Sequence, residues 1–432
     1  MFLVVKSGNN CLICTKIFIK MNVRKISILL IFSVLMMQSC DSNSLKRAMA
    51  KYYFSDFDLE AVGGNVSTMN VIDSAETIII PEIVSDVVSV NYKEICDTVF
   101  IVRLETAKNC LLGRILKFSL LNDSIYVKDK YQSLMMFAPD GKFVRKISNI
   151  GQGPGEYSEL TDFFVDDKIY ILDNMRSKLS VFSKTGEFLY DRKLPFLSLQ
   201  IGKLNPETFV FRAFNNYNLH INALDNYCIW TTDTCFNVQK RGMYCDLELN
   251  KFFSNPNGMC FADGLASLYE METDSLFVIT ENFDLRCRYV LKFNDYHTFD
   301  IFKNMTSMEY KKFFNTNEDY IWVLGCRFNN SFVVVNFMQR GKGTNWLLYN
   351  SNSKKTCLIN EISFNGVAVI SLDELFDEFV FYKDYFVVSK DPLEMPRKGE
   401  ITKYVGGYFG EIKDDDNPVL VFFKMKPVSN IF

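Results

Sequence analysis

The chain has 432 residues, enough for one large all-β domain or for two or three average domains. Hydrophobic residues make up 48% and charged residues 23%, the balance of a folded globular protein with a full core. The formal net charge of −3 argues against nucleic acid as a partner, because no broad basic field is present to hold phosphates. Only two histidines occur, which argues against zinc hydrolases and histidine-based acid–base catalysis, and we expect no metal site and no cofactor.

The N-terminal region predicts an export signal. A basic stretch at residues 21–25 precedes an apolar run at residues 26–37, and Ser39 and Cys40 follow directly after Gln38. A charged segment, an apolar run of this length and a small residue before the processing point describe a secretory signal. The run is shorter than the about 20 residues that a membrane-spanning helix needs. We therefore expect residues 1–39 to be an N-terminal extension followed by a signal peptide.

Cys40 makes this signal resemble that of bacterial lipoproteins, in which such a cysteine carries the lipid and becomes the mature N-terminus. Met37 and Gln38 depart from the commonest residues at this site, so a plain signal peptide and an uncleaved anchor are the alternatives. The resemblance implies lipid attachment at Cys40 and anchorage to a membrane of the cell envelope. The outer membrane is the expected location, with the protein facing the periplasm or the cell surface.

Residues 40–77 show no clear period and are predicted to be a tether, whereas residues 78–432 are predicted to form the folded domain. From residue 78 onward, short apolar or alternating runs rich in branched and aromatic residues follow one another, as in a series of β-strands. The clearest runs are residues 99–102, 124–127, 168–172, 208–211, 275–279, 332–335, 346–349, 385–388 and 419–423. Helices are predicted only at residues 307–315 and 373–378, so the chain is expected to be nearly all β.

An internal repeat sharpens this prediction. Residues 134–145 can be laid over residues 179–190 with an offset of 45, and Gly141 then falls on Gly186 where a hairpin turn needs positive φ. About 40–50 residues for four strands is the period of a propeller blade. The repeat fades after residue 200. We predict an all-β β-propeller of six blades, each of four antiparallel strands, with a ring of seven as the alternative.

The same region carries a family likeness. Segments at residues 103–106, 111–113, 125–127 and 139–143 follow in order, and the string Gly-Gln-Gly-Pro-Gly-Glu-Tyr at residues 151–157 comes after them. This order and spacing resemble the six-bladed β-propeller lipoproteins that are abundant in the Bacteroides group and are distantly similar to NHL-repeat propellers. That family has no established common activity, so the resemblance implies a fold and a location rather than a chemistry.

The strongest local signal is the loop at residues 151–157, whose glycines and proline impose an unusual backbone path. On the structural interpretation, which we favour, the loop connects two blades. Its glycines allow a tight backbone path, and its Glu and Tyr side chains hold the loop in place. On the functional interpretation, its polar side chains lie at the mouth of the funnel and bind a ligand. The candidate binding residues are Gln152, Glu156, Tyr157 and Arg103, and the motif loop comprises Gly151, Gly153, Pro154 and Gly155.

The remaining candidates are interpreted as structural. His220 lies in a strand-like segment and is expected to be a core residue, and the acidic run at residues 414–416 reads as an exposed turn. The nine cysteines after Cys40 are expected to be buried small apolar side chains, although Cys228 and Cys235 could face each other across a hairpin.

These observations predict a binding or scaffold module of the cell envelope, with a glycan, a peptide or an envelope protein as its partner. No catalytic set is found, so binding is favoured over catalysis. The alternative is a carbohydrate-active enzyme, either a polysaccharide lyase or a glycoside hydrolase, on the same ring. A buried cluster of carboxylate, Arg and Tyr lining the central channel would favour the enzyme. A flat or apolar face would favour the binding module, and a plugged channel a purely structural one.

Overall fold

The computed structural model describes residues 42–81, 89–121, 123–147, 149–213, 217–244, 258–262, 264–269, 273–293, 305–317, 320–339, 343–364, 369–372, 378–395, 405–406 and 412–426. The chain forms two compact units, Met1–Ser55 and Asp56–Phe432. The predicted signal peptide and Cys40 lie outside the described residues. In the first unit, the described part is helix α2 (Ser42–Tyr53). Within the described ranges, no helix is long and apolar enough to cross a membrane.

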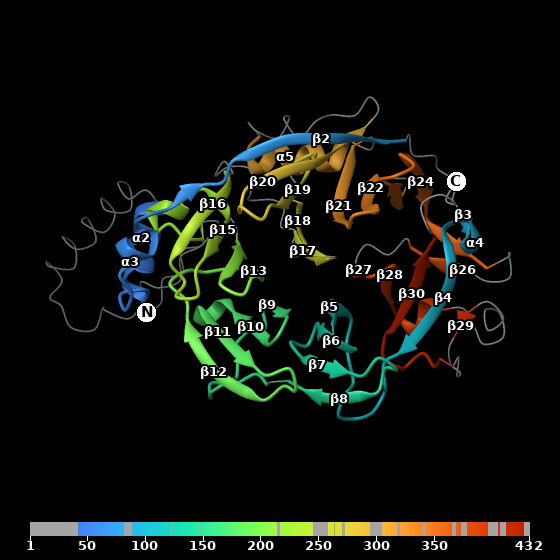
Figure 1. Ribbon diagram of the computed structural model, residues 1–432, viewed down its shortest axis with the longest axis horizontal. Helices are drawn as coiled ribbons and strands as arrows, with labels where there is room; N and C mark the ends of the chain where they lie inside the picture. Colours follow the sequence, from blue (N-terminus) through green and yellow to red (C-terminus); the bar gives the residue numbers. More distant parts are fainter. Residues whose placement is uncertain are drawn as a thin grey trace, which may run out of the picture. The chain divides into compact units, whose positions relative to one another are not determined.

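The second unit is built from β-sheets, and from β5 onward these sheets follow the chain in order around a ring (Figure 1). The first sheet contains β5 (Ile115–Leu121), β6 (Ser124–Asp129), β7 (Leu134–Phe137) and β8 (Phe143–Lys146). The second contains β9 (Asp162–Val165), β10 (Ile169–Asp173), β11 (Lys178–Phe182) and β12 (Phe188–Lys193). The third contains β13 (Gln200–Asn205), β14 (Thr208–Arg212), β15 (Tyr227–Thr232) and β16 (Val238–Tyr244), with β1 (Ser67–Thr68) at its edge.

Four further sheets continue the ring. The fourth contains β17 (Met259–Ala262), β18 (Leu265–Tyr269), β19 (Ser275–Ile279) and β20 (Leu285–Phe293), with β2 (Val71–Ile80) at its edge. The fifth contains β21 (Ile321–Phe328), β22 (Phe332–Gln339), β23 (Gly343–Asn350) and β24 (Lys355–Ile359). A small sheet contains β3 (Ser89–Asn91), β25 (Glu361–Ser363) and β26 (Val369–Ser371). The last contains β27 (Phe379–Tyr382), β28 (Tyr385–Lys390), β30 (Val419–Met425), β4 (Cys96–Arg103) and β29 (Val405–Gly406).

The all-β propeller is confirmed, but the prediction of six blades is wrong, because the described residues form seven. The blades are unequal. Six have four or five strands, and the seventh, β26-β25-β3, has three. Figure 1 shows β3 and β26 on the outer side of the ring. This blade could not be predicted from the sequence, because β3 comes from the N-terminal region and pairs with β25, about 270 residues further along the chain.

The N-terminal segment runs along the outer edges of several blades instead of acting only as a tether. β1 pairs in parallel with β16, β2 with β20, and β3 with β25. The predicted domain boundary at residue 78 therefore falls inside β2. Asp284 holds the start of this strand, since its carboxylate accepts hydrogen bonds from Asn70 N at 3.0 Å and from Lys240 Nζ at 2.8 Å.

The ring closes between the two ends of the second unit. β4 pairs in antiparallel register with β30 from Cys96 opposite Met425 to Arg103 opposite Val419. One sheet thus combines strands from the beginning and the end of the domain. Because an open propeller would leave a strand edge unpaired, this pairing removes the exposed edge.

Buried apolar side chains fill the spaces between neighbouring sheets. Among the described residues they form six clusters, and each draws its members from adjacent sheets. The small β26-β25-β3 sheet shares its cluster with the two sheets beside it, through Val90, Ile362 and Ile370. Many of the aromatic side chains pack in these clusters or against them. The Phe100 and Phe422 rings, for example, stack across β4 and β30 with their centroids 4.5 Å apart.

The two-copy repeat is confirmed in detail. Gly141 and Gly186 take φ of +84° and +79° in the turns before β8 and β12. Each turn makes the same pair of backbone hydrogen bonds, and the phenylalanine rings on either side of each turn meet edge to face at 5.8 and 5.7 Å. The same turn recurs in the next two blades, where Phe236 and Phe283 stand at φ of +68° and +58°.

Eight of the nine predicted strands lie within observed strands, and the run predicted at residues 168–172 begins one residue before β10. The helix predicted at residues 307–315 is α5 (Ser307–Thr316), which begins with a capping box of Thr306 and Glu309. Most of the helix predicted at residues 373–378 lies outside the described residues. The short helices α3 (Leu59–Gly63) and α4 (Tyr92–Ile95) and the 3₁₀ turns η1 (Asn174–Arg176), η2 (Asn222–Leu224) and η5 (Pro392–Glu394) were not predicted.

The interpretation of His220 as a core residue is confirmed, whereas the expectation of buried cysteines is met by five of the eight described ones and contradicted by the exposed Cys235. His220 is buried, and its Nε2 lies 2.9 Å from the carbonyl oxygen of Pro195. Five of the eight described cysteines of the propeller are buried. Cys228 and Cys235 form no disulfide with each other, so the suggested hairpin disulfide is absent from this structure.

Candidate functional site

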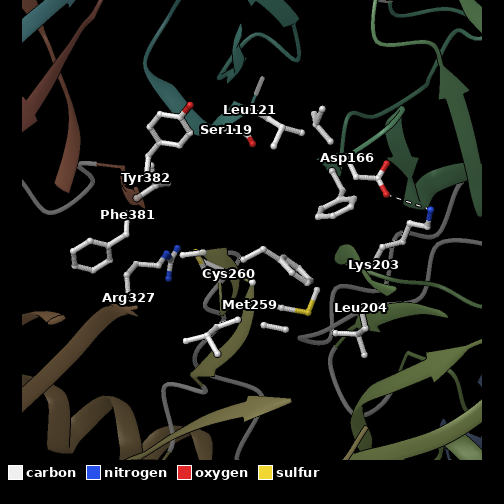
Figure 2. Close-up of a pocket in the computed structure, with 18 of the residues that line it drawn as sticks. Ser119, Leu121, Asp166, Lys203, Leu204, Met259, Cys260, Arg327, Phe381 and Tyr382 are labelled. Carbon is white, nitrogen blue, oxygen red and sulfur yellow. Dashed lines mark ion pairs between the residues drawn. The ribbon is translucent and has the colours of Figure 1, made fainter. Parts of the chain in front are cut away.

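A cavity of about 630 Å³ lies where the innermost strands of the blades meet. Its lining comes mainly from β5, β9, β13, β17 and β27, with Arg327 on β21 and the ends of β18 and β19, so six blades contribute to it (Figure 2). The small β26-β25-β3 blade supplies none of the described residues that line it. The volume falls within the range of about 300–1,000 Å³ that is typical of small-molecule sites. At this level the described residues therefore leave the centre of the ring unfilled.

Strand geometry directs apolar side chains into this cavity. On β9, Phe164 keeps some exposure while its neighbours Phe163 and Val165 are buried, as the two-residue alternation of a strand requires. Gly202 on β13 leaves room for the ring of Phe261, because a Cβ atom there would lie 2.0 Å from that ring. Phe164 and Phe261 meet edge to face, with ring centroids 5.1 Å apart.

On the opposite side, an arginine and a glutamate face each other. Figure 2 shows Arg327 and Tyr382 across the cavity from Asp166 and Lys203, with the Arg327 guanidinium directed toward the middle. The Arg327 side chain is 6% exposed, and its Nη2 lies 3.8 Å from Oε1 of Glu378. Its Nη1 donates to the carbonyl oxygen of Cys326 at 2.9 Å, and the guanidinium carbon lies 5.6 Å from the Phe379 ring centroid.

A second ion pair ties three innermost strands together. Lys117 Nζ on β5 lies 2.6 Å from Asp162 Oδ1 on β9 and donates to the carbonyl oxygen of Phe163 at 2.9 Å. The other carboxylate oxygen of Asp162 accepts from the backbone N–H of Ile201 on β13 at 3.0 Å. Nearby, Lys128 Nζ donates to the carbonyl oxygen of Thr161 at 2.6 Å, and burial lowers the pKa of this lysine.

A third group of charges stands on the Asp166 side of the cavity. Lys203 Nζ lies 3.2 Å from Asp166 Oδ2 and 3.8 Å from Asp167 Oδ1, and it donates to the Tyr170 hydroxyl at 3.2 Å. Burial and a hydrogen bond with Asp167 raise the pKa of Asp166, whereas Asp167 itself has a lowered pKa because of that hydrogen bond. Burial raises the pKa of Tyr170 to about 12. Lys203, the cation of this group, thus has two carboxylates beside it.

The thiol of Cys260 also lines the cavity but is not poised as a nucleophile. Burial raises the pKa of this thiol, and the nearby Arg327 guanidinium opposes that effect only in part. A raised pKa keeps sulfur in the unreactive thiol form at neutral pH. Within the described residues, no group of three or more His, Cys, Asp or Glu side chains could hold a metal ion. The arrangement is suited to hydrogen bonding with a bound molecule.

The motif loop lies outside this cavity, on the chain that leads into β9. Glu156 accepts a hydrogen bond from Gly153 N at 2.7 Å, and the buried Tyr157 donates its hydroxyl to the carbonyl oxygen of Gln132 at 2.5 Å. Gly155 has a φ of +74° and packs against Phe188. Gln152 and Pro154 are exposed, and Gly151 N donates to the carbonyl oxygen of Tyr157 at 2.9 Å. These contacts are those of a pinned blade connection, and a binding role for Gln152, Glu156 and Tyr157 stays a prediction.

Arg103 does not join that loop. Its Nη2 makes an ion pair with Asp416 at 2.7 Å, so the acidic run at residues 414–416 contributes to closing the ring near the end of β4. Glu105, which follows on the chain, instead accepts from Phe143 N at 2.9 Å. The partner of the Arg103 side chain is therefore Asp416. Among the described residues, no hydrogen bond or ion pair joins Arg103 to Gln152, Glu156 or Tyr157. A binding role for Arg103 also stays a prediction.

Sequence reasoning missed the residues that line the cavity. Lys117 and Arg327 stand alone in otherwise apolar strands, and Glu378 directly precedes one. A charged residue inside an apolar strand is a signal that could have flagged Lys117 and Arg327, since burying a charge requires a partner. No spacing in the sequence links these positions, because each belongs to a different blade.

Fold and cavity together define the class of protein: a β-propeller with a ligand-sized cavity at the meeting point of its innermost strands. The chain belongs to the family described as "Domain of unknown function (DUF4934)", whose model matches residues 75–424. No curated protein matches the chain.

Solved structures share the fold. The crystal structure of a predicted exported protein from Bacteroides fragilis is similar, with a TM-score of 0.63 and 18% identity over 83% of this chain and 100% of that chain. That of a member of the DUF4221 family from Bacteroides vulgatus has a TM-score of 0.44 and 13% identity, over 77% of this chain and 98% of that chain. The first likeness supports the propeller fold, and the second is too distant to add to it.

Proposed function

We propose that the protein is an exported, lipid-anchored propeller of the cell envelope that binds a small ligand in its central cavity. The observation that carries the binding role is the cavity itself, with a volume of about 630 Å³ and a lining of aromatic rings and charged side chains from six blades. Such a combination of apolar walls and a few polar groups is typical of ligand sites. A glycan or a peptide fits this description, and an envelope protein could present either.

Export is supported by the signal at residues 21–39 and by the Bacteroides fragilis protein of similar fold, which is named as exported. The lipid anchor rests on Cys40, and the outer membrane is the proposed location. Replacing Cys40 by alanine should release the protein from the membrane fraction. If the Cys40→Ala variant stays bound after a carbonate wash, the lipid-anchor proposal is wrong.

One observation favours an enzyme as the second candidate. Arg327, Glu378 and Tyr382 line the same cavity, which is the combination of Arg, carboxylate and Tyr that a carbohydrate-active enzyme would use. The test is to incubate the protein with any glycan that binds and to analyse the mixture for shorter or unsaturated products. Product formation would establish the enzyme, whereas an unchanged glycan supports the binding module.

Binding is tested by the thermal midpoint of the full-length protein in the presence of glycans, short peptides and divalent ions. A ligand that binds only the folded state at 100 times its dissociation constant stabilises it by about 2.7 kcal/mol. The midpoint should rise with ligand concentration. In a matched Ser119→Trp variant, whose indole would occupy the cavity lined by Ser119, the rise should disappear while the unliganded midpoint stays near wild type. A rise that survives this substitution would place the ligand elsewhere.

A further inference from the structure

The Arg327 guanidinium has hydrogen-bonding capacity that the described residues do not use. A guanidinium carries five N–H donors. Among the described residues, the hydrogen bond to the Cys326 carbonyl oxygen uses one of them. With the side chain only 6% exposed, donors that remain unpaired are costly unless water or a ligand oxygen accepts from them. The cavity side of Arg327 therefore favours a molecule that brings acceptor oxygens.

Glu378 makes the second half of this arrangement. Its Oε1 lies 3.8 Å from Arg327 Nη2, which exceeds the hydrogen-bond range of about 2.7–3.2 Å. Two atoms at this separation can both lie at hydrogen-bond distance from one oxygen atom placed between them. A hydroxyl group suits that position, because it can accept from the guanidinium and donate to the carboxylate at the same time.

The charge balance of the cavity disfavours a strongly charged ligand. Arg327 stands beside Glu378, Lys117 is paired with Asp162, and Lys203 with Asp166. Lys383 and Glu281 also line the cavity and add one charge of each sign. A cavity in which cations and carboxylates balance in this way offers no surplus positive charge to compensate for removing an anion from water. A neutral ligand rich in hydroxyl groups pays no such penalty.

The cavity also offers aromatic rings on which a ligand can pack. Phe164 and Phe261 line the cavity and meet edge to face. The ring of Phe381 points away from the cavity and is buried in the core (Figure 2). A pyranose ring has hydroxyl groups along its edge and apolar C–H groups on its faces, and such faces pack on aromatic side chains while the edge makes hydrogen bonds.

We propose that the cavity binds a neutral saccharide, with a ring hydroxyl bridging Arg327 and Glu378 and a C–H face against the phenylalanine rings. This inference rests on the proposed function, namely that the cavity is the ligand site, and adds the class of ligand and the two residues that select it. It distinguishes neutral sugars from uronic acids, which carry a carboxylate, and from peptides.

The test uses matched pairs of probes with the full-length protein. The methyl glycosides of glucose, galactose and mannose are compared with the corresponding methyl uronides, and tri-alanine serves as the peptide probe. Binding is followed by saturation-transfer NMR and titration. At least one neutral glycoside should bind at least tenfold more tightly than its uronide. Tighter binding of a uronide, or binding of tri-alanine alone, overturns the inference and leaves the proposed ligand site intact. If no probe of any class binds, both fail.

Variants then locate the hydroxyl bridge. Glu378→Gln keeps the shape of the side chain, and Arg327→Gln removes the guanidinium, so each should weaken binding of the neutral glycoside at least tenfold. Arg288→Gln is the matched control, since Arg288 lies on β20 outside the cavity lining and contacts Asn330. Unchanged affinity in the Glu378→Gln variant, with a wild-type unfolding midpoint, would overturn the assignment of the bridge even if Arg327→Gln fails to fold.

Discussion

The turn glycine Gly141 offers a sharp test of how the blades fit together. An alanine at this position would have a φ of +84°, a conformation that costs an L-residue about 1–2 kcal/mol. The added Cβ would also lie 1.9 Å from the carbonyl oxygen of Arg103 at the end of β4. Because that atom belongs to the backbone, the turn itself must move away from the neighbouring strand.

Moving the turn breaks two hydrogen bonds that join it to the closing strand region. Glu105 N donates to the Gly141 carbonyl oxygen at 2.8 Å, and Phe143 N donates to the Glu105 carboxylate at 2.9 Å. A hydrogen bond contributes about 0.5–1.5 kcal/mol, and one to a charged group about 1.5–3 kcal/mol. Together with the backbone strain, we expect Gly141→Ala to lower the free energy of unfolding by about 3–6 kcal/mol.

The equivalent glycine of the next blade is the matched control. In Gly186→Ala the strain of the positive φ is the same, but the new Cβ would meet the side-chain atoms Arg145 Cδ and Ile147 Cδ1 at 2.7 and 2.8 Å. Flexible side-chain ends can shift, so the expected loss is about 1–2 kcal/mol. Urea unfolding followed by tryptophan fluorescence and circular dichroism measures both variants. Equal losses for Gly141→Ala and Gly186→Ala would refute the reasoning that backbone contact decides the cost.

Three further predictions concern pH, thiol reactivity and the motif loop. Hydrogen bonds from Lys240 and Asn70 lower the pKa of Asp284. The stability that this carboxylate contributes is therefore fully present above the ordinary carboxyl pKa, and it is lost as the pH falls through the lowered pKa of the folded state. The urea midpoint of Asp284→Asn should therefore fall below wild type at pH 7 and approach it at pH 3; a constant difference would contradict this. Burial raises the pKa of Cys96, so iodoacetamide at pH 8 should label the exposed Cys235 and spare Cys96 until urea is added, as read by mass spectrometry. Tyr157→Phe removes the hydrogen bond to the Gln132 carbonyl and should cost about 1–2 kcal/mol in urea unfolding, while leaving ligand affinity unchanged if the loop is only a blade connection.

Much of the fold could be predicted because strands are local features. Runs of branched and aromatic residues marked nine strands, and the matched glycines of the first two blades marked their shared turn. The repeat faded after residue 200 for a physical reason that the structure makes visible. In the next two blades, Phe236 and Phe283 occupy the positive-φ position. Phe236 is buried among apolar side chains of its blade, and this packing offsets the strain that favours glycine elsewhere.

The candidate site shows the opposite case. The loop at residues 151–157 stood out in the sequence because its glycines are unusual, yet its contacts are those that hold a blade connection in place. The cavity residues could not be identified from the sequence, because none of them forms a motif with its neighbours along the chain. Arg327 and Glu378 are about 50 residues apart and lie on successive large blades, so only the closed ring brings them within 3.8 Å.

The strands, the blade period and the shared turn could therefore be predicted, because each depends on residues close together along the chain, whereas the export signal stays a prediction. The number of blades, the path of the N-terminal strands and the identity of the cavity residues could not be predicted in this way. They depend on pairing between distant segments, such as β3 with β25 and β4 with β30. Such pairings leave no period in the sequence, because each strand needs only to be apolar enough to be buried.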